Sequence, residues 1–393
     1  MRICLTMVVK NEEHVIERAL RSALPFIDCY SIVDTGSTDR TVEIIQETLR
    51  SVPGQILAHP WEGFGATRTK ALRLAELGYD GTDVPMPRPD YLLLLDADDY
   101  LESAAIVTFG QAIDLGVLGS YREHLNIGAH DLYECRSRFE SIEYARALLV
   151  RAGAGFKYTG RTHEFLDHEG PSTKGVLEAI TYVWTEDSAR RKNPILRFQE
   201  NVEALTLDIE EDPENAARWT FYLAQEYKDA GALEKALEIY DRRARMPGWP
   251  EETWRAAYEG ARLAEQLALN DVVARYRHAY AMRPERVEPL VDLARVMRAA
   301  GHHTDARIYA QAAMGVPMPK GERLFLDPSY YGWRREIEYA LALWWTGSQE
   351  ESIQRHWRLL DEKGLPTEAR ALVSANLGAC GVVVPEPRAH APD

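Results

Sequence analysis

Apolar positions in the first half of the chain form short continuous runs that alternate with helically spaced stretches. The runs are typical of buried strands and cover 3–9, 30–34, 55–58 and 91–95. Helical spacing follows at 15–24, 40–49 and 66–78, and Ser37-Thr38-Asp39 offers capping chemistry to the second of these helices. The alternation predicts an open, Rossmann-like α/β sheet, in which ligands bind at the carboxyl ends of strands.

From about residue 196 the pattern is helical throughout, and it repeats. The set Leu223, Tyr227, Gly231 and Ala236 recurs 70 positions later as Leu293, Met297, Gly301 and Ala306. Two units of about 35 residues with a glycine turn resemble the tetratricopeptide repeat. We expect about four helical hairpins, one of them degenerate around 258–282. The predicted domains are therefore 1–195, α/β, and 196–385, all-α and tetratricopeptide-like.

The repeat domain has more than one interpretation. A helical array of this kind usually offers a concave surface to a partner, or stacks on a second copy to form a homodimer. It can equally be a helical support with no ligand of its own. The sequence leaves these alternatives open.

Composition and charge narrow the classes of function. The chain is 46% hydrophobic and carries a formal charge of −15, so phosphates of nucleic acid would be repelled by most of its surface. A negatively charged donor would need a local positive site or a metal ion. Without a membrane-length apolar run or a signal-peptide pattern, and with four scattered cysteines, we expect a cytoplasmic protein with reduced thiols.

The strongest chemical signal is the acidic group that follows the run at 91–95. Asp96-Ala97-Asp98-Asp99 places carboxylates in the turn beyond a buried strand, at the mouth of the sheet. There Asp96 and Asp98 can share a divalent cation, and hard oxygen ligands suit Mg²⁺ or Mn²⁺. Such an ion would neutralise the charge that develops on a diphosphate leaving group.

Four segments together resemble the sugar-nucleotide domain of GT-A glycosyltransferases, and most of all the inverting family-2 enzymes. They are 9–13 (VKNEE), 33–39 (VDTGSTD), 66–68 (ATR) and 95–98 (LDAD), and the likeness covers roughly residues 1–190. The resemblance implies a metal-dependent transfer of a sugar, with inversion, from a nucleotide donor in which UDP is the first candidate.

The resemblance also implies roles for individual residues. The segment from Val8 to Glu12, with Lys10 within it, would line the base pocket, and Asp34 would accept hydrogen bonds from the base or ribose. Arg68 would approach the phosphates or the base, Asp96 would contact the ribose and metal, and Asp98 would be the main metal ligand. The predicted donor and metal set is Val8, Lys10, Glu12, Asp34, Arg68, Asp96, Ala97 and Asp98. Thr35 stands where a second aspartate is common in the family.

The acceptor side is expected around Gly160-Arg161-Thr162-His163-Glu164, which follows a strand-like segment near 156–158. An inverting transfer needs a general base near the acceptor nucleophile. Similar Gly-x-x-His-Glu segments occur in related family-2 enzymes. Glu164 is the candidate base, with His163 orienting it or ligating the cation; a purely structural turn is the alternative. Asp187 and Glu140 are rival bases, and the basic stretch 190–192 could fold over the diphosphate.

Two other classes of function remain in view. A nucleotidyltransferase also uses paired acids and metal, but it would normally show a glycine- and arginine-rich phosphate loop, which 10–13 lacks. A repeat scaffold with a degenerate nucleotide-sugar domain is the second alternative. The acceptor itself stays open between a peptide, a protein, a saccharide and a modified nucleic acid.

Overall fold

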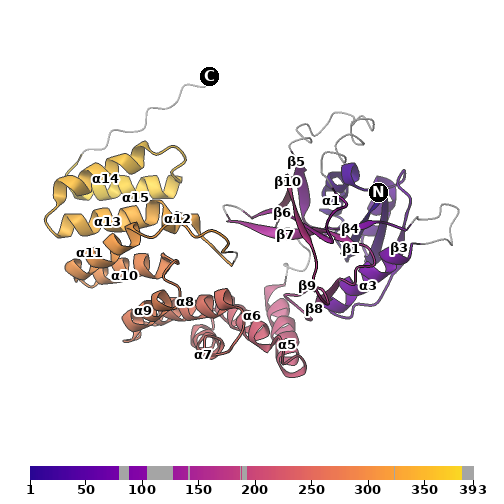
Figure 1. Cartoon of the computed structure of the whole chain (residues 1–393), viewed down its shortest axis with the longest axis horizontal. Coiled ribbons are helices and arrows are strands. Elements are labelled where there is room, and N and C mark those ends of the chain that lie inside the picture. Colours follow the sequence, from indigo (N-terminus) through magenta and orange to yellow (C-terminus); the bar gives the residue numbers. More distant parts are fainter. Residues whose placement is uncertain are drawn as a thin grey trace, which may run out of the picture. The chain divides into compact units, whose positions relative to one another are not determined.

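The computed structural model describes residues 1–78, 88–103, 127–139, 142–185, 187, 193–322 and 324–382. Contacts within the chain group it into two compact units, Met1–Glu226 and Tyr227–Asp393 (Figure 1). No helix in the described part of the chain is long and apolar enough to span a bilayer.

The first unit is built on an eight-stranded sheet of order β3-β2-β1-β4-β7-β6-β10-β5. Its first four strands are mutually parallel: β1 (Ile3–Val9), β2 (Cys29–Asp34), β3 (Gly54–Ala58) and β4 (Tyr91–Leu94). Between them run α1 (Ile16–Ala23), the short 3₁₀ turn η1 (Leu24–Phe26), α2 (Thr41–Thr48) and α3 (Phe64–Leu77). The four strands and three helices predicted from the apolar pattern are all present, with ends that differ by at most two residues.

The other half of the sheet is mixed, and the sequence pattern did not predict it. Strand β7 (Ile142–Arg151) runs antiparallel to β4 and to β6 (Leu132–Phe139). Strand β10 (Lys174–Val183) is parallel to β6 and antiparallel to β5 (Tyr100–Ser103). A separate hairpin joins β8 (Lys157–Thr159) to β9 (Phe165–Asp167).

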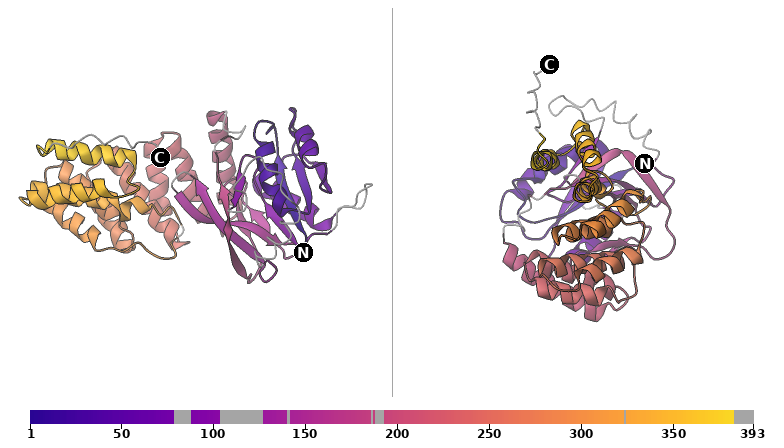
Figure 2. Two further views of the ribbon diagram at one scale, coloured as in Figure 1. Left: turned by 90° about the horizontal axis from the view of Figure 1, so that it is seen from above. Right: turned by 90° about the vertical axis from the view of Figure 1, so that its left-hand side faces the viewer.

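Strand β1 divides two core layers because its side chains alternate between the faces of the sheet. Ile3, Leu5 and Met7 pack with residues of α1 and α2 on one face. On the other face Cys4 packs with Leu72 of α3 and with residues of β4 and β7. The sheet is thus covered on both sides, as parallel strands require, and the strands and covering helices can be followed in Figure 2.

Helices make up the rest of the described chain. They begin with α5 (Pro194–Glu211) and α6 (Ala216–Asp229) and continue with α7 (Leu233–Arg243), α8 (Pro250–Gln266), α9 (Val272–Met282), α10 (Glu288–Ala299), α11 (His303–Met314), α12 (Pro328–Tyr331), α13 (Trp333–Trp345), α14 (Gln349–Asp361) and α15 (Thr367–Ala379). The change to helix falls at the predicted position near 195. The contacts nevertheless group α5 and most of α6 with the sheet.

The glycines that carried the repeat pattern have one structural role. Gly231 and Gly301 adopt a positive φ, of 78° and 79°, in the turn after a helix, and Gly347, in the turn after α13, does the same at 87°. A residue without a Cβ adopts this conformation at little cost. The region expected to be degenerate still forms a helical pair, α8 and α9, held by the buried aromatic side chains of Trp254, Tyr258 and Tyr276. Helical repeats therefore follow the α/β unit.

A buried carboxylate crosslinks the start of this helical array. Glu259 of α8 is 2% exposed and pairs with Arg255, Arg262 and Lys228 at 2.6, 3.2 and 3.4 Å. Burial alone would raise the pKa of Glu259, but these three cations outweigh it and lower the pKa to about 2. The carboxylate is thus charged at neutral pH, and its charge stabilises the folded unit.

We expect stability of the helical unit to fall on acidification because of this group. A depressed folded pKa gives stability that is fully present above the ordinary value of 4.5 and is lost as the pH falls toward 2. The loss between pH 7 and pH 3 is about 2 kcal/mol. Urea unfolding of the full chain, followed by hydrogen exchange of the α8 amides at pH 7 and pH 3, measures it. Glu259→Gln should remove this part of the pH dependence, whereas Glu238→Gln, on the exposed surface of α7, should not; equal behaviour of the two variants would contradict the assignment.

Candidate active site

The acidic motif lies just beyond the carboxyl end of β4. Asp34, the last residue of β2, lies at the same edge of the sheet because β1, β2 and β4 are parallel. The backbone N–H of Asp96 donates to the hydroxyl of Tyr182 at 3.1 Å, and the N–H of Asp99 donates to the carbonyl of Asp96 at 3.3 Å. The motif therefore forms a fixed turn at the mouth of the sheet.

Both carboxylate oxygens of Asp96 are held by arginines. Oδ1 pairs with Nη2 of Arg68, and Oδ2 accepts a hydrogen bond of 2.6 Å from Nη2 of Arg146. Burial by itself would raise the pKa of Asp96, but the charges of Arg68 and Arg146 outweigh it and lower the pKa to about 2. Asp96 is consequently ionised and fixed in orientation.

Arg68 joins the donor side of the site to the acceptor side. It comes from the first turns of α3, and its Nε lies 2.8 Å from Oε1 of Glu164 while its Nη2 pairs with Asp96. Its guanidinium also lies 5.5 Å from the ring centroid of Tyr158 on β8. Three residues predicted from separate motifs, Arg68, Asp96 and Glu164, are thus brought together.

Two residues of this site were missed in the sequence. Arg146 of β7 lies 4.2 Å from the ring centroid of Tyr182 on β10, and the hydroxyl of Tyr182 donates to Asp99 at 2.9 Å. The available signal was a charged side chain within the otherwise apolar run 145–150. A lone arginine in a buried strand requires a partner, and here the partner is Asp96.

The two remaining acids of the motif are held differently. The carbonyl of Asp98 accepts hydrogen bonds from Arg18 at 2.6 Å and from the Thr185 hydroxyl at 2.7 Å. Asp99 is buried and accepts from Tyr182 and from the Thr185 N–H. Burial, followed by the charges of Asp96 and Asp98, raises the pKa of Asp99 to about 8. Its contacts are those of a structural residue of the turn.

The loops after β1 and β2 are tied together by polar contacts. Asn11, whose φ is 56°, accepts from the N–H of Thr38 at 2.7 Å, and the N–H of Glu12 donates to Thr41 at 2.7 Å. Asp34 accepts from the N–H of Ser37 at 3.1 Å. Asp39 accepts from the N–H of Thr41 at 3.0 Å, but the residue at the N-cap position of α2 is Arg40, whose side chain makes no capping hydrogen bond, so the predicted cap at 37–39 lies one residue too early.

The other predicted donor residues lie along the same edge. Val8 borders a small cavity of about 20 Å³ that Arg68 and Tyr158 also line. Lys10 is exposed, whereas Glu12 and Ala97 are buried. These positions are compatible with the predicted base pocket, and their roles stay predictions.

The last two residues of the turn between β8 and β9, His163 and Glu164, point toward different partners. Glu164 faces Arg68, while the ring of His163 lies 2.8 Å from Oε1 of Glu226 on α6 and stacks on Tyr222 with centroids 4.3 Å apart. Burial raises the pKa of Glu226, but the hydrogen bond and charge of His163 outweigh it, so the net shift is downward. The ring of His163 therefore contacts Glu226 and Tyr222, which both lie on α6.

Of the alternative general bases, the structure describes Asp187 but not Glu140. Asp187 pairs with Arg18 at 3.1 Å, and Arg18 also contacts Asp98, so Asp187 is linked to the motif. Glu140 and the basic stretch 190–192 lie outside the described residues.

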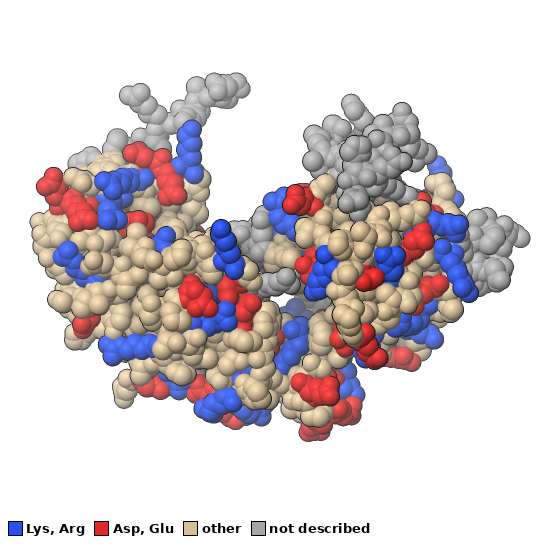
Figure 3. Space-filling view, in the orientation of Figure 1, with Lys and Arg blue, Asp and Glu red and all other residues tan. Residues whose placement is uncertain are grey.

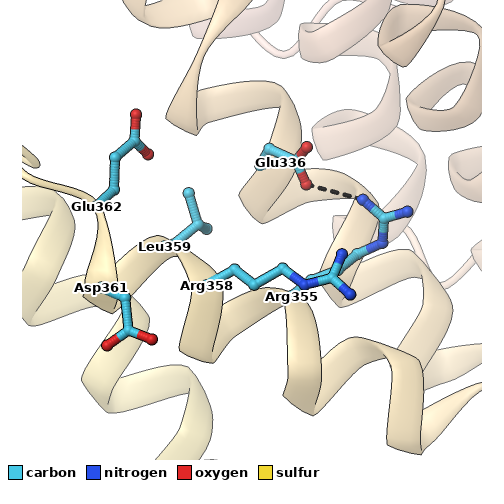
Figure 4. A pocket seen from close by; sticks show the side chains of 6 residues that line it. All are labelled: Glu336, Arg355, Arg358, Leu359, Asp361 and Glu362. Atoms are coloured by element: carbon cyan, nitrogen blue, oxygen red, sulfur yellow. Dashed lines mark hydrogen bonds and ion pairs between the residues drawn. The ribbon is translucent and has the colours of Figure 1, made fainter.

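No group of three or more His, Cys, Asp or Glu side chains within the described ranges is arranged to hold a metal ion. A cation here would need further oxygen ligands from a bound phosphate or from water. A cavity of about 380 Å³ lies in the helical unit between α13 and α14, and none of the residues that line it is a candidate site residue (Figure 4). Its arginine at position 355 already pairs with Glu336 at 3.0 Å.

Charges of both signs are interspersed over the face of the molecule in Figure 3. Arg68 and Arg146, with side chains 21% and 25% exposed, are cations of the site, and both are paired with Asp96.

The fold and the site together define a glycosyltransferase domain followed by helical repeats. Residues 4–108 match the family model described as glycosyl transferase family 2, so the N-terminal domain is one of family 2. No curated protein matches the chain.

Similar solved structures include S. aureus TarS 1–349 in complex with UDP-GlcNAc, at 13% identity and a TM-score of 0.36, over 83% of this chain and 99% of that one. MamA is 13% identical with a TM-score of 0.33, over 50% of this chain and 92% of that one. YrrB, a tetratricopeptide-repeat protein, is 16% identical with a TM-score of 0.35, over 46% of this chain and 85% of that one. At these scores the likeness does not extend to activity.

Two glycines of the β8–β9 region give a matched test of the packing around the turn. Gly160 and Gly170 have φ of 103° and 92°, so alanine is strained at both by about 1 kcal/mol. A Cβ at Gly160 would lie 2.4 Å from the Trp219 ring of α6, whereas one at Gly170 would meet nothing within 4 Å. We expect Gly160→Ala to destabilise the first unit by about 1–3 kcal/mol more than Gly170→Ala in urea unfolding. Equal losses would show that Trp219 does not pack on this turn.

Proposed function

We propose that the chain transfers a sugar from a UDP-sugar donor to an acceptor hydroxyl, with inversion and with the help of a divalent cation. The observation that carries the proposal is the Arg68 guanidinium between Asp96 of the acidic motif and Glu164 of the β8–β9 turn. This arrangement supplies in one site a binding group for a nucleotide diphosphate and a carboxylate for proton transfer.

The arginines suit the leaving diphosphate. Guanidinium groups form charge-assisted, often bidentate hydrogen bonds with phosphate oxygens and stay protonated at any working pH. Arg68 of α3 and Arg146 of β7 are partly buried beside the acidic motif, where a phosphate would be shielded from water. Their present partner, Asp96, holds both side chains in place in the absence of a donor.

Asp98 is the residue we propose to hold the cation. Both oxygens of Asp96 already face arginines, so of the two predicted metal ligands Asp98 fits the role better. Its backbone is fixed by Arg18 and Thr185, which places the carboxylate reproducibly. Bound Mg²⁺ or Mn²⁺ would stabilise the negative charge on the departing diphosphate.

Glu164 is the proposed general base. It would accept the acceptor's hydroxyl proton as the oxygen bonds to the anomeric carbon, while the bond to the diphosphate breaks and its electron pair leaves with the nucleotide. Attack opposite the leaving group inverts the anomeric carbon. Arg68 contacts Glu164 directly, so the base lies beside the proposed phosphate ligands.

A second candidate function is a binding protein in which the nucleotide-sugar domain is degenerate and the repeats recruit a partner. The intact set of Arg68, Asp96, Asp98 and Glu164 favours the enzyme. The acceptor class, whether peptide, protein, saccharide or modified nucleic acid, and a homodimer through the repeats remain predictions.

Replacing Asp98, the proposed cation ligand, distinguishes the two proposed functions, an enzyme or a binding protein. With Mn²⁺ and a panel of UDP-hexoses, we expect the wild type to release UDP. Asp98→Asn should lower kcat at least about 100-fold, since several kcal/mol of charge stabilisation is lost. Asp90→Asn, an exposed aspartate before β4, is the control and should keep full activity. Absence of metal-dependent UDP release from the wild type would favour the binding protein.

The base is tested by exchanging two carboxylates for amides. Glu164→Gln should lower kcat by about 10²–10⁴-fold, the usual contribution of a general base, with little change in UDP affinity. Asp187→Asn should retain most activity. The reverse ranking would make Asp187 the base. The anomeric configuration of the product, read by NMR, must be opposite to that of the donor; retention would rule out direct displacement.

A further inference from the structure

Four consecutive residues of the β8–β9 turn are each held by a residue of α5 or α6. Gly160 packs under the Trp219 ring, and the N–H of Arg161 donates to Asp208 at 2.7 Å. The Thr162 hydroxyl contacts Asn201 at 3.2 Å, and His163 contacts Glu226 at 2.8 Å. The pairs are Gly160–Trp219, Arg161–Asp208, Thr162–Asn201 and His163–Glu226, all within the first compact unit.

These contacts are buried and connected to one another. Trp219 is fully buried, and Asn201 and Asp208 are 5% and 4% exposed. The side-chain amide of Asn201 donates to the same oxygen of Glu226 that meets His163, at 2.8 Å. Glu226 therefore joins α5, α6 and the turn in one polar network.

The other side of the turn is fixed to α3. The N–H of Phe64 donates to the carbonyl of Arg161 at 3.0 Å, and the N–H of Gly65 donates to the carbonyl of Gly160 at 3.1 Å. A Cβ at Gly65 would lie 2.3 Å from that carbonyl oxygen, so only glycine permits this approach. Arg68, the ion-pair partner of Glu164, follows three residues later on α3. The turn that carries Glu164 is therefore fixed to the same helix as Arg68.

The backbone at His163 decides where its neighbours point. Its φ of 49° is left-handed, which costs a non-glycine residue energy unless surrounding contacts hold it. The contact with Glu226 and the stacking on Tyr222 supply that hold. Glu164 comes directly afterwards and faces Arg68.

We propose that Trp219, Asn201, Asp208 and Glu226 of α5 and α6 hold the β8–β9 turn in place, and that His163 and Glu226 are positioning residues that place the Glu164 carboxylate. The inference rests on the proposed function, in which Glu164 is the base. The first helices after the sheet thus serve the sugar-transfer site itself, whatever partner the later repeats bind. A chain cut near residue 200 would lose Glu226 and Trp219, and with them the hold on the base.

Steady-state kinetics of the full-length chain test this placement, with UDP-hexose hydrolysis and Mn²⁺ as the assay and UDP affinity measured by calorimetry. Glu226→Ala should lower kcat by about 10- to 100-fold, since misplacing a catalytic group by about 1 Å has effects of this size. UDP affinity should stay within about twofold, because the donor side is untouched. Glu226→Gln should retain at least about a third of kcat, since its amide oxygen still accepts a hydrogen bond.

Two further variants separate placement from loss of folding. His163→Asn keeps a residue that tolerates positive φ but shortens the side chain, and it should lower kcat as Glu226→Ala does. Glu203→Ala removes an exposed carboxylate from α5 and should change nothing. Melting temperatures confirm that each variant is folded.

The outcomes distinguish this inference from the proposed function. No UDP release by the wild type would remove the proposed function, and the positioning role with it. An active wild type whose Glu226→Ala and His163→Asn variants match Glu203→Ala would overturn the positioning role alone. A loss of UDP affinity equal to the loss of kcat would also overturn it, because it would indicate general damage to the site.

Discussion

The Arg68 guanidinium is the interaction on which the rest of the site depends. Asp96 and Glu164 reach it from different parts of the chain, and their side chains are only 18% and 13% exposed. Two carboxylates so poorly hydrated need a shared counter-charge. Arg68 provides it from α3, and Arg146 completes the pairing of Asp96 from β7. The sheet, α3 and the hairpin are therefore joined by electrostatics at the point where chemistry is proposed.

Much of this arrangement could be predicted from local sequence. The strands at 3–9 and 91–95 are recognisable from their apolar runs, and the rule that ligands gather at the carboxyl ends of parallel strands places the site at that edge of the sheet. Arg68, Asp96 and Glu164 each stood in a recognisable segment. Of the three, only Asp96 follows a strand of the main sheet; Arg68 lies on α3 and Glu164 in the turn of the separate β8–β9 hairpin.

The rest could not be predicted because it depends on pairing between distant strands. Arg146 reaches Asp96 because β7 runs antiparallel to β4. Tyr182 reaches the motif from β10, which lies two strands beyond β7 in the sheet. These contacts span 50 and 86 residues of sequence. The alternation of apolar and polar residues along a strand shows which face of the sheet each side chain lies on. It does not show which strand lies beside it or in which register the two strands pair.

The direction of His163 shows the same limit at a single residue. A motif resemblance placed His163 beside Glu164, but the left-handed backbone at His163 and the hydrogen bond to Glu226 send its ring toward α6. The direction of the His163 ring, toward Glu164 or toward α6, depends on the backbone angle φ at this residue, and that angle could not be predicted from the sequence.

The helical half of the chain raises a related question of where a domain ends. The sequence changes to helices at α5, whereas the contacts place the division after Glu226. A repeat array must cover the apolar face of its first hairpin, and terminal repeats usually do so with a polar cap. Here the face of α6 that carries Trp219 is covered by the β8–β9 turn instead. The burial of Trp219 thus covers the apolar face of α6 and also fixes the turn that bears Glu164. For this reason the helices begin at α5, whereas the contacts divide the chain after Glu226.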